Sequence, residues 1–184
     1  MKSEEFQRPH LYLDMDGVQA DFFSAWARWH NQKFGMSHVE RYKDIGSKEQ
    51  REQSISELNK EGEQFIEEFF ANLPVLTGFP KLLSFLNQNQ ISFTVLSAPL
   101  RGNNKASIAG KKTWLDQHNP GTSSSAIFTG DKSRYAQKNG QANVLVDDYK
   151  PYIQKWSDAG GIPVLHRDEN VGNTIEQLKK IYKI

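Results

Sequence analysis

Short apolar runs alternate with amphipathic stretches along most of this 184-residue chain. The runs place leucine, isoleucine, valine and phenylalanine on neighbouring positions, which is typical of strands buried on both faces of a sheet. We predict such strands at residues 11–15, 91–96, 126–129, 143–146 and 161–165. The stretches between and after the later strands repeat apolar residues with helical spacing, over residues 78–89, 105–118, 149–159 and 174–182. This alternation predicts an α/β fold, with a parallel sheet, right-handed crossovers and helices on both faces.

The long region between the first two predicted strands lacks any strand pattern. It opens with a predicted helix over residues 20–34, in which aromatic side chains follow the helical period: Phe22, Phe23, Trp26 and Trp29. Two more helices are predicted, at residues 49–60 and 63–70. We therefore expect a core domain of residues 1–17 and 77–184, with a small helical cap of residues 18–76 inserted after the first strand.

The composition narrows the classes of partner. Lysine and arginine number 23 against 22 aspartate and glutamate, a formal net charge of +1, which gives no electrostatic reason to expect nucleic acid or a membrane surface. The chain has no cysteine, so disulfides and thiolate zinc sites are excluded. No apolar run is long enough for a signal core or a membrane span, and we expect a cytoplasmic protein. The oligomeric state stays open, a homodimer included.

Polar side chains stand at the carboxyl ends of the first four predicted strands. They are Asp14 and Asp16 after the first, Ser97 after the second, Lys132 after the third, and Asp147 with Asp148 after the fourth. Each alone has an ordinary interpretation, as a turn, a surface lysine or a helix cap. Ligands bind at this edge of open α/β sheets, and four signals on one edge are much less expected by chance than any one. The sequence therefore predicts the functional site there.

These residue types together suit phosphoryl transfer. A carboxylate can attack phosphorus and form an aspartyl-phosphate, and a second carboxylate nearby can act as general acid and base. A hydroxyl and a lysine ammonium group can hold phosphate oxygens. Further carboxylates suit Mg²⁺, which prefers one or two carboxylates together with phosphate oxygens and water. We therefore predict a Mg²⁺-dependent reaction on a small-molecule phosphate ester.

Four motifs resemble those of the haloacid dehalogenase (HAD) superfamily of phosphatases. The segment D-M-D-G-V (14–18) resembles its first motif, L-S-A-P-L-R (96–101) its second, G-D-K-S (130–133) its third and V-L-V-D-D (144–148) its fourth. Within the superfamily the chain is similar to the 5′(3′)-deoxyribonucleotidases, through Ala20-Asp21-Phe22, F-F-A-N-L-P-V-L-T-G (69–78) and G-K-K-T-W-L (110–115). The resemblance covers nearly the whole chain and implies the Rossmann-like HAD fold.

The resemblance also implies roles for the acidic residues. Asp14 would be the nucleophile and a metal ligand. Asp16 would be the general acid and base, and would give Mg²⁺ its backbone carbonyl. Asp147 and Asp148 would complete the metal site.

The remaining matched residues would contact the substrate. The resemblance implies that the phosphate is held by Ser97, the adjoining Ala98 and Lys132. Two cationic side chains would lie near the substrate, Arg101 and Lys111, and the ring of Phe22 would form part of the nucleoside pocket.

Three functions stay open at this level. The first is hydrolysis of a nucleoside monophosphate, a deoxyribonucleotide before others. The second keeps the chemistry on another ester, such as a sugar phosphate, a phosphorylated cofactor or a nucleic-acid 3′-phosphate end. The third is a binding or regulatory protein without turnover, which the complete set of catalytic residues disfavours. The choice of base, sugar and 5′ or 3′ phosphate stays open, because residues 41–44 lack the aromatic pair that lines the base pocket of the resembled branch.

Overall fold

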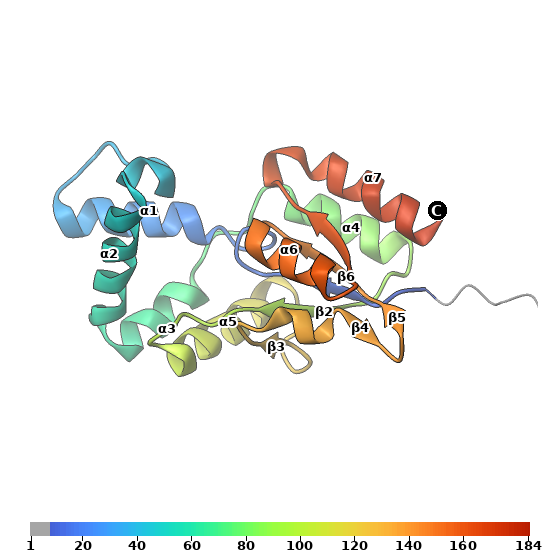
Figure 1. The fold of residues 1–184 in the computed structure, drawn as a ribbon. Helices are drawn as coiled ribbons and strands as arrows, with labels where there is room; N and C mark the ends of the chain where they lie inside the picture. Colours follow the sequence, from blue (N-terminus) through green and yellow to red (C-terminus); the bar gives the residue numbers. More distant parts are fainter. Residues whose placement is uncertain (1–7) are drawn as a thin grey trace, which may run out of the picture.

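Five parallel strands form the central sheet of the computed structural model, which describes residues 8–184 (Figure 1). In spatial order they are β3 (Ile127–Phe128), β2 (Phe93–Ser97), β1 (Leu11–Leu13), β6 (Val144–Asp147) and β7 (Ile162–Leu165). The central strand β1 pairs in parallel with β2 on one side and β6 on the other, so that Leu13 lies level with Val95 and Val146. The predicted parallel α/β sheet is confirmed.

Helices cover both faces of this sheet. Three of them contribute to the main hydrophobic cluster, together with Leu13 and Val146 of the strands: α4 (Phe79–Gln88), α5 (Asn104–His118) and α7 (Val171–Tyr182). A second cluster joins Trp156 of α6 (Lys150–Asp158) to Leu96 and Leu145. Because successive side chains of a strand point to opposite faces, the two clusters mark the two faces of the sheet.

Three further helices lie beside the sheet rather than on its faces, at the left of Figure 1: α1 (Phe22–Phe34), α2 (Lys48–Leu58) and α3 (Glu63–Ala71). The two chain segments that lead into and out of this group are hydrogen-bonded to each other. Asp21 N donates to Pro74 O (2.8 Å), and Leu76 N donates to Gln19 O (2.9 Å). The helices occupy the place expected for the cap, and the domain boundaries themselves stay a prediction.

A short hairpin was not predicted from the sequence. Strands β4 (Gln137–Lys138) and β5 (Gln141–Ala142) pair antiparallel. Between them Asn139 and Gly140 have φ values of 52° and 76°, both positive as a type I′ turn requires. The Asn-Gly pair is a strong hairpin signal, but the flanking residues are too polar and too few to show a strand pattern.

The predicted helices and the other strands are present, with shifts at their ends. β1 ends at Leu13, before a loop of residues 14–21 that we call the acidic loop, and α7 begins already at Val171. Short 3₁₀ helices extend or connect the main elements: η1 (Tyr42–Ile45), η2 (Asn59–Glu61), η3 (Lys132–Tyr135) and η4 (Asp168–Asn170). None of the helices found in residues 8–184 combines the length and apolar character that crossing a bilayer requires.

Gly110 of α5 allows the close approach of α3. A Cβ at this position would lie 2.2 Å from the Glu67 carbonyl oxygen and 2.8 Å from Phe70 Cβ, and backbone atoms cannot move away cheaply. We expect Gly110→Ala to lower the free energy of unfolding by about 1–3 kcal/mol, as overpacked core substitutions do. Urea denaturation measures this.

The matched control is Gly172→Ala in α7, where an added Cβ meets nothing within 4 Å. This variant should be as stable as the wild type or more stable by about 0.5–1 kcal/mol, because alanine favours the helix. Equal destabilisation by both substitutions would contradict the packing interpretation.

Candidate active site at the carboxyl edge of the sheet

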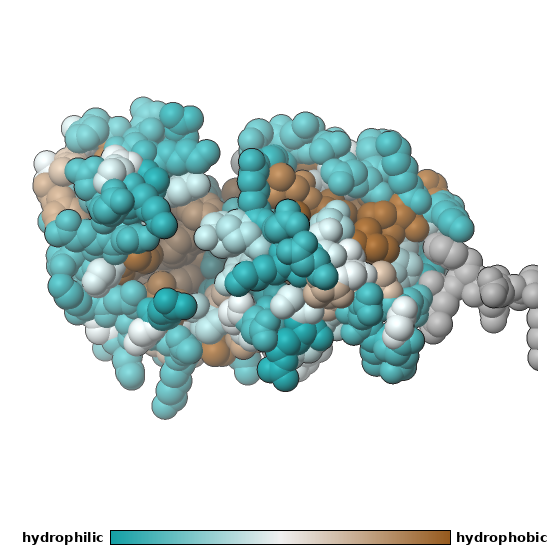
Figure 2. All heavy atoms as spheres, in the orientation of Figure 1, coloured by the Kyte–Doolittle hydropathy of each residue, from teal (hydrophilic) through white to brown (hydrophobic). Residues whose placement is uncertain are grey.

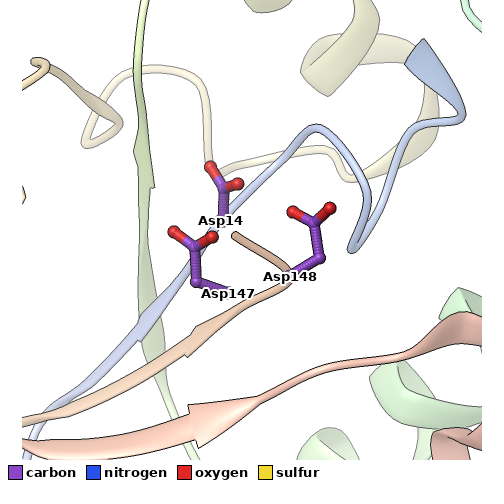
Figure 3. Close-up of side chains that lie close together, drawn as sticks. All are labelled: Asp14, Asp147 and Asp148. Carbon is purple, nitrogen blue, oxygen red and sulfur yellow. The ribbon is translucent and has the colours of Figure 1, made fainter. Parts of the chain in front are cut away.

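Three carboxyl groups from two neighbouring strands meet at the carboxyl edge of the sheet (Figure 3). Asp14 directly follows β1, and Asp147 and Asp148 stand at the end of β6; each offers an oxygen within 4.8 Å of the others. The register explains the meeting, since Leu13 and Val146 are level and the next residue of each strand is an aspartate. Asp14 and Asp147 are buried, and Asp148 is half-buried.

The ammonium group of Lys132 joins two of these carboxylates. Its Nζ lies 2.8 Å from Asp14 Oδ1 and 2.6 Å from Asp147 Oδ2. Lys132 opens η3 after β3, is 2% exposed, and lies 4.6 Å from the ring centroid of Tyr152. Burial acts to lower the pKa of Lys132, but the carboxylates of Asp14 and Asp147 outweigh it and raise the pKa above its usual value. The lysine therefore carries its charge inside the protein.

One ammonium group does not neutralise three carboxylates. Burial, and then the charge of Asp14, raise the pKa of Asp147 to about 7, although Lys132 opposes the shift. Burial, followed by the charges of Asp14 and Asp147, raises the pKa of Asp148 to about 8. Such shifts indicate a deficit of positive charge. A hard divalent cation such as Mg²⁺, which takes carboxylate oxygens as ligands, fits this donor set and would supply the missing charge.

The acidic loop after β1 is shaped around Asp148. Gly17 has a φ of +81°, and a Cβ there would lie 2.3 Å from Asp148 Cγ, so a larger residue would occupy the space of that carboxyl group. Behind the loop, the buried Gln19 donates from Nε2 to Asp14 O (2.9 Å) and accepts from Asn119 Nδ2 (2.9 Å). These contacts fix the backbone at Asp14 and leave its carboxylate facing the other two.

A second buried lysine holds Asp16. Lys111 of α5 has no exposed surface, and its Nζ donates to Asp16 Oδ2 (2.7 Å), Ser97 Oγ (2.9 Å) and Ala98 O (2.6 Å). Burial raises the pKa of Asp16 above its usual value, and Lys111 opposes that shift. Since these three contacts use all three N–H groups of the ammonium, Lys111 lies behind the site rather than on its surface.

A cavity of about 590 Å³ opens beside Asp16, and we call it the aromatic cavity. Its lining includes Phe22, Ala98 and Arg101, three of the residues predicted from the sequence. Figure 2 shows apolar surface in the recess between the group of helices α1 to α3 and the rest of the molecule. Asp16 and these three residues thus line the cavity. The other predicted residues lie in two groups at the same edge of the sheet: Lys111 with Ser97, and Lys132 with Asp14 and Asp147 beside Asp148.

Several lining residues were not predicted as part of the site. Tyr42 of η1 lies with its ring centroid 4.6 Å from that of Phe23 and 6.1 Å from that of Trp26, and all three line the aromatic cavity. Phe23 and Trp26 belong to the aromatic stripe of the helix predicted over residues 20–34, and helical periodicity does not separate a core face from a cavity wall. Tyr42 lies in a segment without periodicity, so no pattern indicated it.

The chain matches, over residues 8–176, the family described as "5′ nucleotidase, deoxy (pyrimidine), cytosolic type C protein". A HAD hydrolase of Entamoeba histolytica (family IA, variant 3) has the same fold, with a TM-score of 0.52 and 16% identity over 94% of this chain and 88% of that one. A haloacid dehalogenase-like hydrolase of Burkholderia xenovorans is similar, with a TM-score of 0.52 and 15% identity over 95% and 99% of the two chains. No curated protein is similar enough in sequence to count as a match.

The raised pKa values make the effect of a cation depend on pH. The folded-state pKa of Asp148, about 8, exceeds its ordinary value of 3.8, so without a cation the stability of the protein falls as pH rises between these values. A bound cation displaces such protons. We expect Mg²⁺ to raise the melting temperature more at about pH 8 than at about pH 6, by roughly 3–5 °C for each tenfold gain in affinity.

Thermal unfolding with and without Mg²⁺ at both pH values measures this difference. Asp148→Asn should lose part of the pH dependence, because one of the titrating carboxylates is gone while Asp147 still titrates. Asp131→Asn changes an exposed carboxylate at the same edge, which instead accepts a hydrogen bond from Ser133, and should behave as the wild type. The same Mg²⁺ effect at both pH values would argue against a cation site in this cluster.

Proposed function

The chain belongs to the family of cytosolic type C deoxy-5′-nucleotidases and is a HAD-type phosphatase, and we propose that it hydrolyses deoxynucleoside monophosphates with the help of Mg²⁺. One observation carries the proposal: the carboxylate of Asp14, held by Lys132 beside Asp147, lies at the same edge as the aromatic cavity. This juxtaposition supports a nucleophile for phosphorus next to a pocket for a nucleobase.

In the first step the Asp14 carboxylate attacks phosphorus, and the P–O bond to the nucleoside breaks. Asp16, which lines the aromatic cavity where the leaving group would lie, donates its proton to the departing oxygen. In the second step Asp16 takes a proton from water, whose oxygen attacks the aspartyl-phosphate and releases inorganic phosphate. Burial raises the pKa of Asp16 above its usual value, which is the direction that a general acid requires.

The phosphate would be held by groups at the ends of two strands, β2 and β3. Ser97 Oγ accepts a hydrogen bond from Lys111, which leaves its own O–H free to donate to a phosphate oxygen. Lys132 supplies positive charge beside Asp14. Ala98 is the next residue after Ser97, so its backbone would lie beside the same phosphate. Mg²⁺, bound by Asp14, Asp147, Asp148 and the backbone carbonyl of Asp16, would offset the charge of the phosphate.

The nucleoside would occupy the aromatic cavity. Its volume of about 590 Å³ falls within the range of small-molecule pockets, roughly 300–1,000 Å³. The rings of Phe22, Phe23, Trp26 and Tyr42 along its wall suit a flat base, because stacking on aromatic side chains stabilises bound bases by about 1–3 kcal/mol each. A sugar phosphate would leave most of these rings without a partner.

Replacing the nucleophile should stop turnover without unfolding the chain. We expect Asp14→Asn to lower phosphate release from a deoxynucleoside monophosphate by at least about 10³-fold, because an amide does not attack phosphorus. Released phosphate and the melting temperature are measured together. Asp131→Asn serves as the control with the same chemical change, and should keep full activity. Turnover by Asp14→Asn close to that of the wild type would rule out this assignment.

A panel of esters tests the substrate class. We expect kcat/KM for deoxynucleoside 5′-monophosphates to exceed that for hexose phosphates by roughly tenfold or more, the value of one stacking contact. Ribonucleotides, 3′-monophosphates and 3′-phosphorylated oligonucleotides complete the panel. Tyr42→Ala should lower kcat/KM for nucleotides and leave that for hexose phosphates as it is. A hexose phosphate as the best substrate would refute the nucleotide assignment while keeping the phosphatase.

A further inference from the structure

A second hollow continues from the aromatic cavity along the core of the molecule. This side groove, of about 460 Å³, shares Ala98, Arg101 and Tyr149 with the aromatic cavity and extends to Gly130 and Lys155. Its walls come from the loop after β2, the start of α5, the segment before η3 and the first turns of α6, and include no residue of α1, α2 or α3. A ligand seated at the sheet edge can therefore reach into both hollows.

The side groove is cationic and lacks compensating acid. Arg101 and Lys155 line it, and no aspartate or glutamate is among its lining residues in the part of the chain that the structure describes. Both side chains are exposed, and within residues 8–184 neither the Arg101 guanidinium nor the Lys155 ammonium group forms an ion pair or hydrogen bond. This contrasts with Lys111 and Lys132, whose ammonium groups are already engaged with carboxylates. Two cationic side chains without a partner among the described residues, next to a phosphate site, favour binding of a second anionic group.

An exposed aromatic side chain stands where the two hollows meet. Tyr149 directly follows Asp148, is 54% exposed, and lines both the aromatic cavity and the side groove. Its ring packs edge-on against Tyr152, with centroids 5.3 Å apart, which holds the ring in place from one side. Aromatic rings flanked by cationic side chains are the common means of holding nucleotides of a single strand.

We propose that the side groove binds a second phosphate of the substrate, so that nucleotides carrying a further phosphoryl group or a phosphodiester-linked nucleotide are preferred over simple monophosphates. This inference rests on the proposed function and deepens it. The terminal monoester is the group hydrolysed: its P–O bond breaks, water supplies the oxygen of the released phosphate, and the second phosphate stays on the product. Arg101 and Lys155 pair with that second phosphate, and Tyr149 stacks on a following base where one is present.

Binding and turnover are measured separately. Calorimetric titration of the Asp14→Asn protein, which retains the groove, uses thymidine 5′-monophosphate, thymidine 3′,5′-bisphosphate and a 5′-phosphorylated thymidine dinucleotide. We expect the last two to bind roughly tenfold tighter than the first, as one charge-assisted contact gives, and the preference to weaken as salt is added. Phosphate release by the wild type with the same three compounds should show the same order in kcat/KM.

Variants assign the preference to the groove. Adding Lys155→Ala to the Asp14→Asn protein should reduce the tenfold preference to about twofold or less. Lys150 is an exposed lysine of the same helix that does not line the groove, so Lys150→Ala should leave the preference unchanged. Tyr149→Ala distinguishes the two sources of the second phosphate. This substitution should weaken binding of the dinucleotide and leave binding of the bisphosphate unchanged if the groove binds a following nucleotide.

Each outcome decides the inference. If the bisphosphate alone binds tighter than the monophosphate, the groove is assigned to a terminal phosphate. If the dinucleotide binds tighter still, and Tyr149→Ala abolishes this additional affinity, the groove is assigned to a nucleic-acid end. Equal binding of all three compounds, or a preference that survives Lys155→Ala, overturns the second-phosphate site. Absence of turnover by the wild type would count against the proposed function, while the binding ratios would still decide the groove.

Discussion

The Lys132 ammonium group is the contact on which the site depends, because it holds carboxylates of two neighbouring strands together inside the protein. Asp14 and Asp147 lie side by side as a direct result of the parallel pairing of β1 with β6, and two buried carboxylates in that position repel each other. Lys132, 2% exposed, lies within 2.8 Å of both. Removing the Lys132 ammonium group would leave two buried carboxylates without compensation, which costs about 3–5 kcal/mol. The charge balance at this edge is therefore also a condition for the stability of the sheet.

The acidic loop links that charge cluster to the helices beside the sheet. The side chain of Gln19 donates to the backbone carbonyl of Asp14, and the backbone carbonyl of Gln19 accepts from Leu76 N. Asp21 N, two residues further on, donates to Pro74 O. The chain thus enters and leaves the helices α1 to α3 through hydrogen bonds that belong to the loop carrying Asp14. A movement of these helices would act on the backbone at Asp14, and the aromatic wall of the cavity moves with them.

The sheet edge could be predicted from the sequence because its causes are local. A buried strand, an aspartate after it and the pairing rules of parallel sheets are enough to bring Asp14 and Asp147 together. The contacts of Lys111 could not be predicted, because they depend on where α5 packs against β2, a result of the whole core. Which aromatic residues belong to the core and which to the cavity could not be predicted either, since Trp26 is only 7% exposed and still lines the cavity. The β4–β5 hairpin carried an Asn-Gly signal, but its strands were too short and polar to support it.

On the proposed function, charge counting gives a reason for a cation and a phosphate ester to bind together at this site. Four carboxylates and two buried ammonium groups leave two negative charges uncompensated: Asp14, Asp16, Asp147 and Asp148 against Lys111 and Lys132. A phosphate monoester near neutral pH adds about two more, and like charges about 4 Å apart repel by roughly 1–4 kcal/mol per pair at the effective dielectric constants of water and protein surfaces. A divalent cation would remove the deficit, and the phosphate would then meet a neutral site in which Ser97 and Lys132 could bind it. On the proposed function, cation binding and substrate binding strengthen each other. The unpaired cations of the side groove lie outside this balance, which leaves them available for an anion that is not the one hydrolysed.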